Sequence, residues 1–178
     1  PNLGRPRLRA RGEMPSVTAV GPIVHSDAAI SRDRVYRYSL VRRWGDGDVV
    51  RWVMLNPSTA SATEDDPTIR RCMGFARAWG YDGIVVHNLY ALRATDPRAL
   101  RTHPDPVGPV NDSYIAGWRV PTVCAWGAHA DTGRAGRAGE VLALLRRTDV
   151  TPMCLGRTKA GHPRHPLYLP AAATLEEL

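Results

Sequence analysis

The hydrophobic and polar positions of the chain divide it into two alternating kinds of segment. One kind is apolar almost throughout and has the length of a strand that is buried on both faces. Four such segments follow one another, at residues 49–55, 83–89, 121–126 and 151–156. The other kind has apolar residues at helical spacing and fills the intervals between the strands, at residues 67–80, 111–119 and 134–147. The first helix has clear ends, because Asp65 or Asp66 can cap it and Gly80 can close it.

This alternation of strands and helices is typical of a parallel sheet with helices on both faces. We therefore predict an α/β fold, a three-layer α/β/α sandwich around a mainly parallel four-stranded central sheet. Residues 36–44 alternate between apolar and polar, and an Asp-Gly turn separates them from 49–55, which predicts an N-terminal β-hairpin arm. We interpret residues 1–20 as a flexible basic tail and 21–178 as a single domain.

The amino-acid composition indicates which class of binding partner and which cellular compartment to expect. The 178 residues carry a formal net charge of +7, almost all of the basic charge is arginine, and arginine suits phosphate. This excess favours a polyanionic partner, although an arginine-rich genome would produce the same composition. Three cysteines lie far apart in the sequence, which favours a reducing compartment. No apolar run approaches the length of a membrane span, so we expect a cytoplasmic protein that does not associate with membranes.

Polar side chains follow three of the predicted strands. Asn56, Pro57 and Ser58 come directly after the first strand, and Asn88 lies at the end of the second. The loop KAGHPRHPLYLP, at residues 159–170, follows the fourth strand. Because ligands bind beyond the carboxyl ends of the strands in such sheets, we expect these segments to form a site at one edge.

The turn between the first strand and its helix has two interpretations. Its hydroxyls, its carboxylates and the positive end of the helix can cradle an anion or hold a water molecule. Alternatively, Asn56 binds its own backbone and Asp66 only caps the helix. The chain contains no Walker or GxGxxG pattern, so a nucleotide-phosphate cradle of those kinds is not expected.

The late loop holds two histidines, His162 and His165, and each is followed by proline. With no carboxylate or cysteine close by, their spacing is poor for metal binding, so we expect neither a metal nor another cofactor. The prolines restrict the backbone and suggest rings that are held in one orientation. A ring positioned in this way can donate a hydrogen bond to a developing negative charge or transfer a proton. Acyl transfer by Ser58 has little support, because the chain lacks a Gly-x-Ser-x-Gly elbow.

Three motifs carry a resemblance to a known family. They are MLNPSTASATEDDPTIRRC at 54–72, HNLYALRATDP at 87–97 and LGRTKAGHPRHPLYL at 155–169. They resemble a family of small bacterial and phage proteins that is catalogued as a domain of unknown function, over roughly residues 36–170. That family in turn looks like an outlying branch of the uracil-DNA glycosylase superfamily. The resemblance implies the fold of that superfamily and hydrolysis of the bond between a base and its sugar.

The resemblance also assigns roles to single residues. Asn56 matches the residue that positions the attacking water, with Pro57 and Ser58 beside it. Asn88 matches the amide that reads the base. His165 matches a late histidine that contacts the base, with Leu167 near the place of a wedging side chain.

The chain departs from the superfamily pattern at several points. Leu55 stands in the region of the usual motif glycine, and no aromatic residue falls between Pro57 and Gly74 to stack on a base. Tyr90, Phe75 or Tyr168 would have to take that role. Three cysteines are too few for the iron–sulfur branches, which need four.

The expected function is therefore that of a DNA glycosylase-like hydrolase that acts on a modified or damaged base, with DNA as its partner. Asp65 or Asp66 would add negative charge near the cationic sugar, with helix capping expected for at least one of them. His165, rather than His162, would face the site. Two alternatives stay open: a hydrolase of free nucleosides, nucleotides or RNA bases, and a non-catalytic nucleic-acid-binding module with the same fold. Three basic residues flank the late loop and are expected to contact phosphates, namely Arg157, Lys159 and Arg164.

Overall fold

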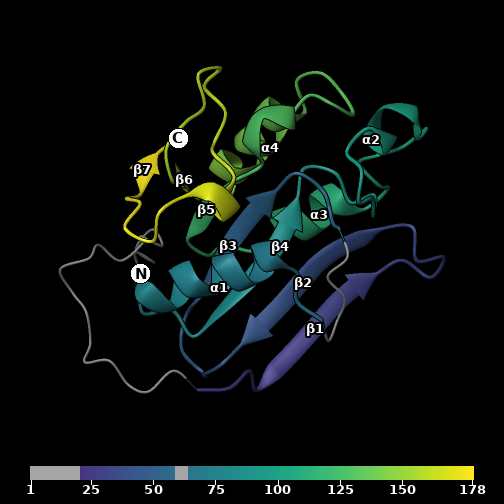
Figure 1. The fold of residues 1–178 in the computed structure, drawn as a ribbon. Helices are drawn as coiled ribbons and strands as arrows, with labels where there is room; N and C mark the ends of the chain where they lie inside the picture. Colours follow the sequence, from purple (N-terminus) through teal and green to yellow (C-terminus); the bar gives the residue numbers. More distant parts are fainter. Residues whose placement is uncertain (1–20, 59–63) are drawn as a thin grey trace.

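The computed structural model of the chain describes residues 21–58 and 64–178, so the basic tail predicted at residues 1–20 lies outside the described residues. Within them, seven strands form one sheet in the order β1-β2-β4-β3-β5-β6-β7 (Figure 1). The strands are β1 (His25–Ile30), β2 (Arg37–Arg43), β3 (Val49–Met54), β4 (Gly83–Asn88), β5 (Thr122–Cys124), β6 (Pro152–Cys154) and β7 (Glu176–Glu177). The chain is therefore a mixed α/β protein.

The centre of this sheet is parallel and its edges are antiparallel. β3 pairs in parallel with β4 and β5, and β5 pairs in parallel with β6. The four segments predicted as strands thus occur and pair in parallel. The predicted strand number is wrong, because β2 pairs antiparallel with β4 at one edge and is followed by β1, which is antiparallel to β2, while β7 extends the other edge antiparallel to β6. Three of the six pairings among the described strands are therefore antiparallel, so the sheet is not mainly parallel as predicted. β1 is largely exposed, and its sequence HSDAAI gives little apolar signal.

β2 and β3 do not form the predicted hairpin, because β4 lies between them. The connecting residues pass around the start of β4: the amide of Trp44 donates to the carbonyl of Asp82 at 2.9 Å, and the amide of Asp82 donates to the carbonyl of Asp48 at 2.8 Å. Gly83 makes the close approach possible, since a Cβ there would lie 2.8 Å from the carbonyl oxygen of Arg42. β2 instead forms an antiparallel pair with β1.

Helices cover both faces of the sheet (Figure 1). α1 (Pro67–Ala78) packs on one face over a core that includes Trp52 and Ile84. α3 (Asn111–Ala116) and α4 (Arg137–Arg147) pack on the other face over a core that includes Val53 and Leu89. The described parts of the connections contain three short helical turns, namely α2 (Ala99–Thr102), η1 (Gly127–His129) and η2 (Pro166–Tyr168). The predicted helices on both faces are confirmed.

β2 contains a bulge near its first residue. Along the pairing with β1, Ala29 lies opposite Ser39, whereas Ile30 lies opposite Arg37. Tyr38 is therefore an extra residue in β2. A bulge of this kind bends the strand and changes the face toward which the neighbouring side chains point.

The bulge reverses the alternation of side chains at the start of β2. Leu40 packs into the core under α1, and strict alternation would place Tyr38 on that face and Arg37 on the other. Instead the Tyr38 ring stacks on Tyr114 of α3, with 5.1 Å between the ring centroids. Arg37 lies on the α1 side, where it lines the same cavity as Ile69 of α1.

Candidate functional site

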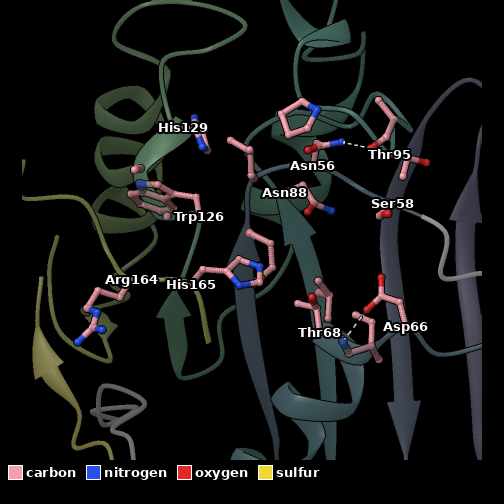
Figure 2. A pocket seen from close by; sticks show the side chains of 18 of the residues that line it. Asn56, Ser58, Asp66, Thr68, Asn88, Thr95, Trp126, His129, Arg164 and His165 are labelled. Atoms are coloured by element: carbon pink, nitrogen blue, oxygen red, sulfur yellow. Dashed lines mark hydrogen bonds between the residues drawn. The ribbon is translucent and has the colours of Figure 1, made fainter. Parts of the chain in front are cut away.

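A cavity of about 610 Å³ opens at the carboxyl edge of the parallel strands. The segments that follow β3, β4, β5 and β6 all contribute to its wall, as the strand topology predicts. Figure 2 shows that their side chains converge from opposite sides on a common space. The wall includes seven of the residues predicted from the sequence, namely Asn56, Ser58, Asp66, Asn88, Arg164, His165 and Tyr168.

Asn56 is held in one orientation by two backbone carbonyls. Its Nδ2 donates to the carbonyl of Ala94 at 2.7 Å and to the carbonyl of Pro57 at 3.1 Å (Figure 2). Because only the NH₂ group can donate, these two contacts fix which side of the amide carries the oxygen. The Oδ1 atom accepts no hydrogen bond from residues 21–58 or 64–178. Asn56 therefore binds its own backbone, as one interpretation of the turn predicts, and still keeps an acceptor in the cavity wall.

Asn88 is the last residue of β4 and is 2% exposed. Its Nδ2 is buried and has no hydrogen-bond partner among the described residues. A buried polar group without a partner costs about 1–3 kcal/mol, and a hydrogen bond to a ligand would recover this cost. The backbone around it is fixed: the Leu89 amide donates to the Met54 carbonyl at 2.8 Å, and Asn111 Nδ2 donates to the Asn88 carbonyl at 3.0 Å.

His165 precedes η2, and its ring caps that turn. Its Nδ1 accepts a hydrogen bond from the Leu167 amide at 3.4 Å, which places the proton of the neutral ring on Nε2. Burial lowers the pKa of His165 below its ordinary value, while the nearby charge of Asp66 opposes the shift. The ring is therefore neutral at pH 7, and it offers an N–H donor from Nε2.

The late loop is joined to the loop after β5. The Gly127 amide donates to the Pro163 carbonyl at 2.9 Å, and a Cβ on Gly127 would lie 3.5 Å from Cβ of His165. His162 lies outside the cavity wall, and its amide and carbonyl form hydrogen bonds with Thr158. Of the two loop histidines, His165 therefore lines the cavity and His162 does not.

Asp66 has two functions in the wall. Its Oδ1 accepts from the Ile69 amide at 2.8 Å, which confirms its predicted role as the N-cap of α1. It also lines the cavity, and its charge acts on His165 and Arg37. The neighbouring Asp65 forms an ion pair with Arg42 at 2.8 Å instead.

Four predicted residues do not line the cavity, namely Pro57, Leu167, Arg157 and Lys159. Pro57 is buried under the turn, and its carbonyl accepts from the Ala94 amide. Arg157 turns toward β7, where its Nη2 donates to the carbonyl of Glu177 at 2.8 Å and its Nε lies 3.4 Å from the Glu176 carboxylate. Of the three basic residues predicted to contact phosphates, only Arg164 lies at the cavity.

The cavity also contains residues that sequence reasoning missed. Trp126 and His129 follow β5. Ligands bind at the carboxyl ends of parallel strands, so this rule predicts that their segment contributes to the site. No sequence motif identifies the two residues themselves. Thr95 lies in the loop after β4, and Thr68 lies in the first turn of α1. Arg37 had no sequence signal, because it lies on an antiparallel strand and faces the cavity only through the bulge.

Arg37 brings a buried positive charge into the wall. The residue is 3% exposed, and burial lowers the pKa of its guanidinium to about 10, with Asp66 opposing the shift and Arg93 and Arg42 adding to it. Arg37 therefore stays cationic at neutral pH. A charge in a poorly solvated wall interacts with ligand charges more strongly than a charge on the surface does.

Two features are absent from the described residues, namely a cluster of metal ligands and a helix that could span a membrane. Over 21–58 and 64–178, no three His, Cys, Asp or Glu side chains gather closely enough to hold a metal ion. None of the helices in the described part of the chain has both the length and the apolar composition needed to cross a bilayer.

Comparison with known proteins identifies the family. The model of the family described as "Protein of unknown function (DUF1643)" matches residues 37–167, which is most of the chain. The chain therefore belongs to this family, in agreement with the resemblance of its motifs. No curated protein and no solved structure matches it.

Proposed function

We propose that this member of the DUF1643 family is a DNA glycosylase-like hydrolase, which cleaves the N-glycosidic bond of a modified or damaged base. One observation carries the proposal: Asn56, Asn88 and His165 come from three distant segments and line one cavity. Each presents a different hydrogen-bonding group there. The resemblance of their motifs to the uracil-DNA glycosylase superfamily, and the parallel centre of the sheet, support the same fold and function.

The proposed reaction begins with a water molecule at Asn56 Oδ1. A side-chain carbonyl orients water through one of its hydrogens but is too weak a base to deprotonate it fully. The water oxygen forms a bond to the sugar carbon as the carbon–nitrogen bond breaks, and the bonding electrons leave with the base. The water then loses a proton to solvent, and the anionic base takes up a proton from solvent after it departs. The sugar passes through an oxocarbenium-like state, which the nearby carboxylate of Asp66 stabilises by its charge.

His165 and Asn88 act on the base in this scheme. The Nε2–H of neutral His165 donates to an oxygen or nitrogen of the base, which becomes more negative as the bond breaks. One such donor is worth about 10²–10³ in rate when it is oriented in advance. The buried Nδ2 of Asn88 gains the partner that it lacks by donating to an acceptor on the base edge.

A base in a duplex reaches such a cavity only after it rotates out of the stack. The mouth offers Arg164 for a phosphate and Tyr168, which is 80% exposed, for contact with a base or sugar. These exposed groups favour a polymer substrate over a free nucleoside, because a nucleoside needs no contacts outside the cavity.

The direct test is mass spectrometry of free bases released from single-stranded DNA, duplex DNA, RNA and nucleosides that carry normal and modified bases. We expect release from DNA, and a loss of about 100-fold or more in Asn56→Ala and His165→Ala. His162→Ala is the matched control in the same loop and should keep most of the activity. Thermal midpoints close to that of the wild type would show that the inactive variants are folded.

Other outcomes would redirect the proposal. Release from nucleosides alone would identify a nucleoside hydrolase. Salt-dependent DNA binding without release of any base would identify a binding module. Full activity of both Asn56→Ala and His165→Ala would rule out this site.

A further inference from the structure

A second hollow, of about 450 Å³, lies next to the cavity. Five residues line it, namely Arg101, Ala128, His129, Asp131 and Thr132. Ala128 and His129 also line the cavity, so the two spaces adjoin at the loop that follows β5. A ligand that fills the cavity can therefore extend past His129 into this second space, which we call the side hollow.

The residues around the side hollow are held in place by the rest of the fold. In the loop after β5, Ala130 is fully buried, and its carbonyl accepts a hydrogen bond from the Tyr90 hydroxyl at 2.7 Å. Arg101 extends from α2, and the preceding residue Leu100 anchors this short helix with a fully buried side chain. Both segments that form the side hollow are thus fixed by buried neighbours.

The donors of the side hollow are available to a ligand. Arg101 and His129 are exposed, and neither side chain forms a hydrogen bond or an ion pair with residues 21–58 or 64–178. Asp131 lines the same hollow without pairing with Arg101, and its Oδ1 accepts from the Gly136 amide at 3.0 Å. An arginine that stays unpaired beside a carboxylate keeps its planar set of N–H donors for a ligand. Phosphate is an anion that this geometry suits well.

The cavity therefore has an available arginine near two separate points of its edge. Arg164 lines the cavity from the loop after β6, and its side chain likewise forms no hydrogen bond or ion pair with the described residues. Figure 2 shows that His129, where the side hollow begins, and Arg164 lie apart, above and below Trp126 in that view. A strand with a phosphate on each side of one nucleotide can supply both points. A nucleoside has no phosphate, and a nucleoside monophosphate has one.

We propose that the side hollow binds, through Arg101 and His129, a phosphate of the DNA strand next to the nucleotide whose base enters the cavity. This inference rests on the proposed function and narrows its substrate to a polynucleotide. The Arg101 guanidinium supplies a positive charge and parallel N–H donors, and the His129 ring supplies one further N–H. The carboxylate of Asp131 opposes the binding by its charge, so its removal should have the opposite effect.

The probe is a short single-stranded oligonucleotide with a tetrahydrofuran abasic residue at its centre, which resembles the product and requires no knowledge of the base. Its affinity is measured by fluorescence anisotropy over a range of salt concentrations. We expect Arg101→Gln to lower the affinity about 10-fold and to reduce the slope of log K against log salt concentration by about 0.7, which corresponds to one phosphate contact.

Two variants serve as controls of position and of sign. Arg98→Gln removes an exposed arginine from the same segment, but Arg98 pairs with Asp96 at 2.7 Å and lines neither space. It should leave the affinity and its salt slope nearly unchanged. Asp131→Asn keeps the acceptor for the Gly136 amide and removes a negative charge, so it should strengthen binding about 2-fold to 3-fold.

A second series of oligonucleotides identifies the phosphate. In each of them one phosphate is replaced by a neutral methylphosphonate. In the wild type, the replacement next to the abasic residue on the side of Arg101 should lower the affinity, and in Arg101→Gln the same replacement should have no further effect. A phosphate on the other side of the abasic residue should show this relation with Arg164→Gln.

Three results would overturn the proposal. The first is an equal affinity of Arg101→Gln and Arg98→Gln, and the second is a methylphosphonate series whose losses are the same in Arg101→Gln as in the wild type. The third is a loss confined to thymidine 5′-monophosphate, measured by calorimetry, with unchanged binding of the oligonucleotide. That result would assign the side hollow to the phosphate of a free nucleotide.

Two further points keep the outcome clear. If Arg101→Gln does not fold, His129→Gln takes its place in both series, and additive losses with every methylphosphonate refute the proposal. None of these measurements requires turnover, so they are independent of the release of bases that tests the proposed function. Absence of release together with the expected binding pattern would refute the glycosylase reaction and support the phosphate site.

Discussion

His87 should make the protein sensitive to mild acid. The residue lies in β4, is fully buried, and has no hydrogen-bond partner for either ring nitrogen among the described residues. Burial, together with a smaller effect of the neighbouring charge of Arg51, lowers the pKa of His87 from 6.5 to about 3. The folded protein therefore keeps this ring neutral at pH values where the unfolded chain protonates it.

The sign and size of the effect follow from these two pKa values. Because the unfolded chain binds the proton first, His87 leaves stability intact above pH 6.5 and lowers it as the pH falls toward the folded value of about 3. Each pH unit inside this window costs about 1.4 kcal/mol, which gives about 2 kcal/mol between pH 6.5 and 5. The whole window corresponds to about 5 kcal/mol, a large part of the stability of an ordinary domain.

The test compares His87→Gln with the wild type by urea unfolding at pH 7, 6 and 5 and constant ionic strength. The free energy of unfolding of the wild type should fall by about 2 kcal/mol more than that of His87→Gln, since the other titrating groups are common to both. His25→Gln, at an exposed position of β1, should follow the wild type. If the difference between wild type and His87→Gln is the same at pH 7 and pH 5, then His87 is not held neutral in the folded state.

Three further predictions concern single elements of the structure. Asp66→Ala should lower the free energy of unfolding by about 1 kcal/mol or more in urea melts, because α1 loses its N-cap, and an unchanged value would contradict that role. Gly83→Ala should destabilise the protein by at least about 1–3 kcal/mol, because its Cβ would meet the Arg42 carbonyl at 2.8 Å, and a neutral effect would show that the strands separate easily. Arg164→Gln should weaken binding of an oligonucleotide and flatten its salt dependence more than Arg157→Gln does, as measured by fluorescence anisotropy, and equal effects would place the strand elsewhere.

The parallel centre of the fold was predictable because burial on both faces leaves a strong apolar signal. The segments at 49–55 and 83–89 contain few polar residues, and the helix between them has a marked cap. The edge strands carry no such signal, since β1 is mostly exposed and β7 has two residues. The hairpin prediction failed because a turn sequence specifies a change of direction, but not whether another strand enters between the two arms.

Some residues of the candidate site could be predicted from the sequence and others could not, for similar reasons. Asn56, Asn88 and His165 follow directly from the rule that sites form at the carboxyl ends of parallel strands, combined with their motifs. The position of Arg37 in the cavity wall could not be predicted from the sequence. It depends on the bulge in β2, which follows from the pairing with β1 and leaves no signal in the alternation of apolar and polar residues. Arg157 and Lys159 were placed by proximity in sequence alone, but the structure turns Arg157 toward β7.

The position of β4 between β2 and β3 has a consequence for synthesis of the chain. β3 pairs only with β4 and β5 among the described strands, so both of its neighbours are made after it. Until the ribosome has released residues 83–88, the apolar segment VVRWVM has no partner and can associate with other exposed chains. β3 therefore stays unpaired until β4 has left the ribosome, and the yield of soluble protein should depend on how quickly that strand arrives.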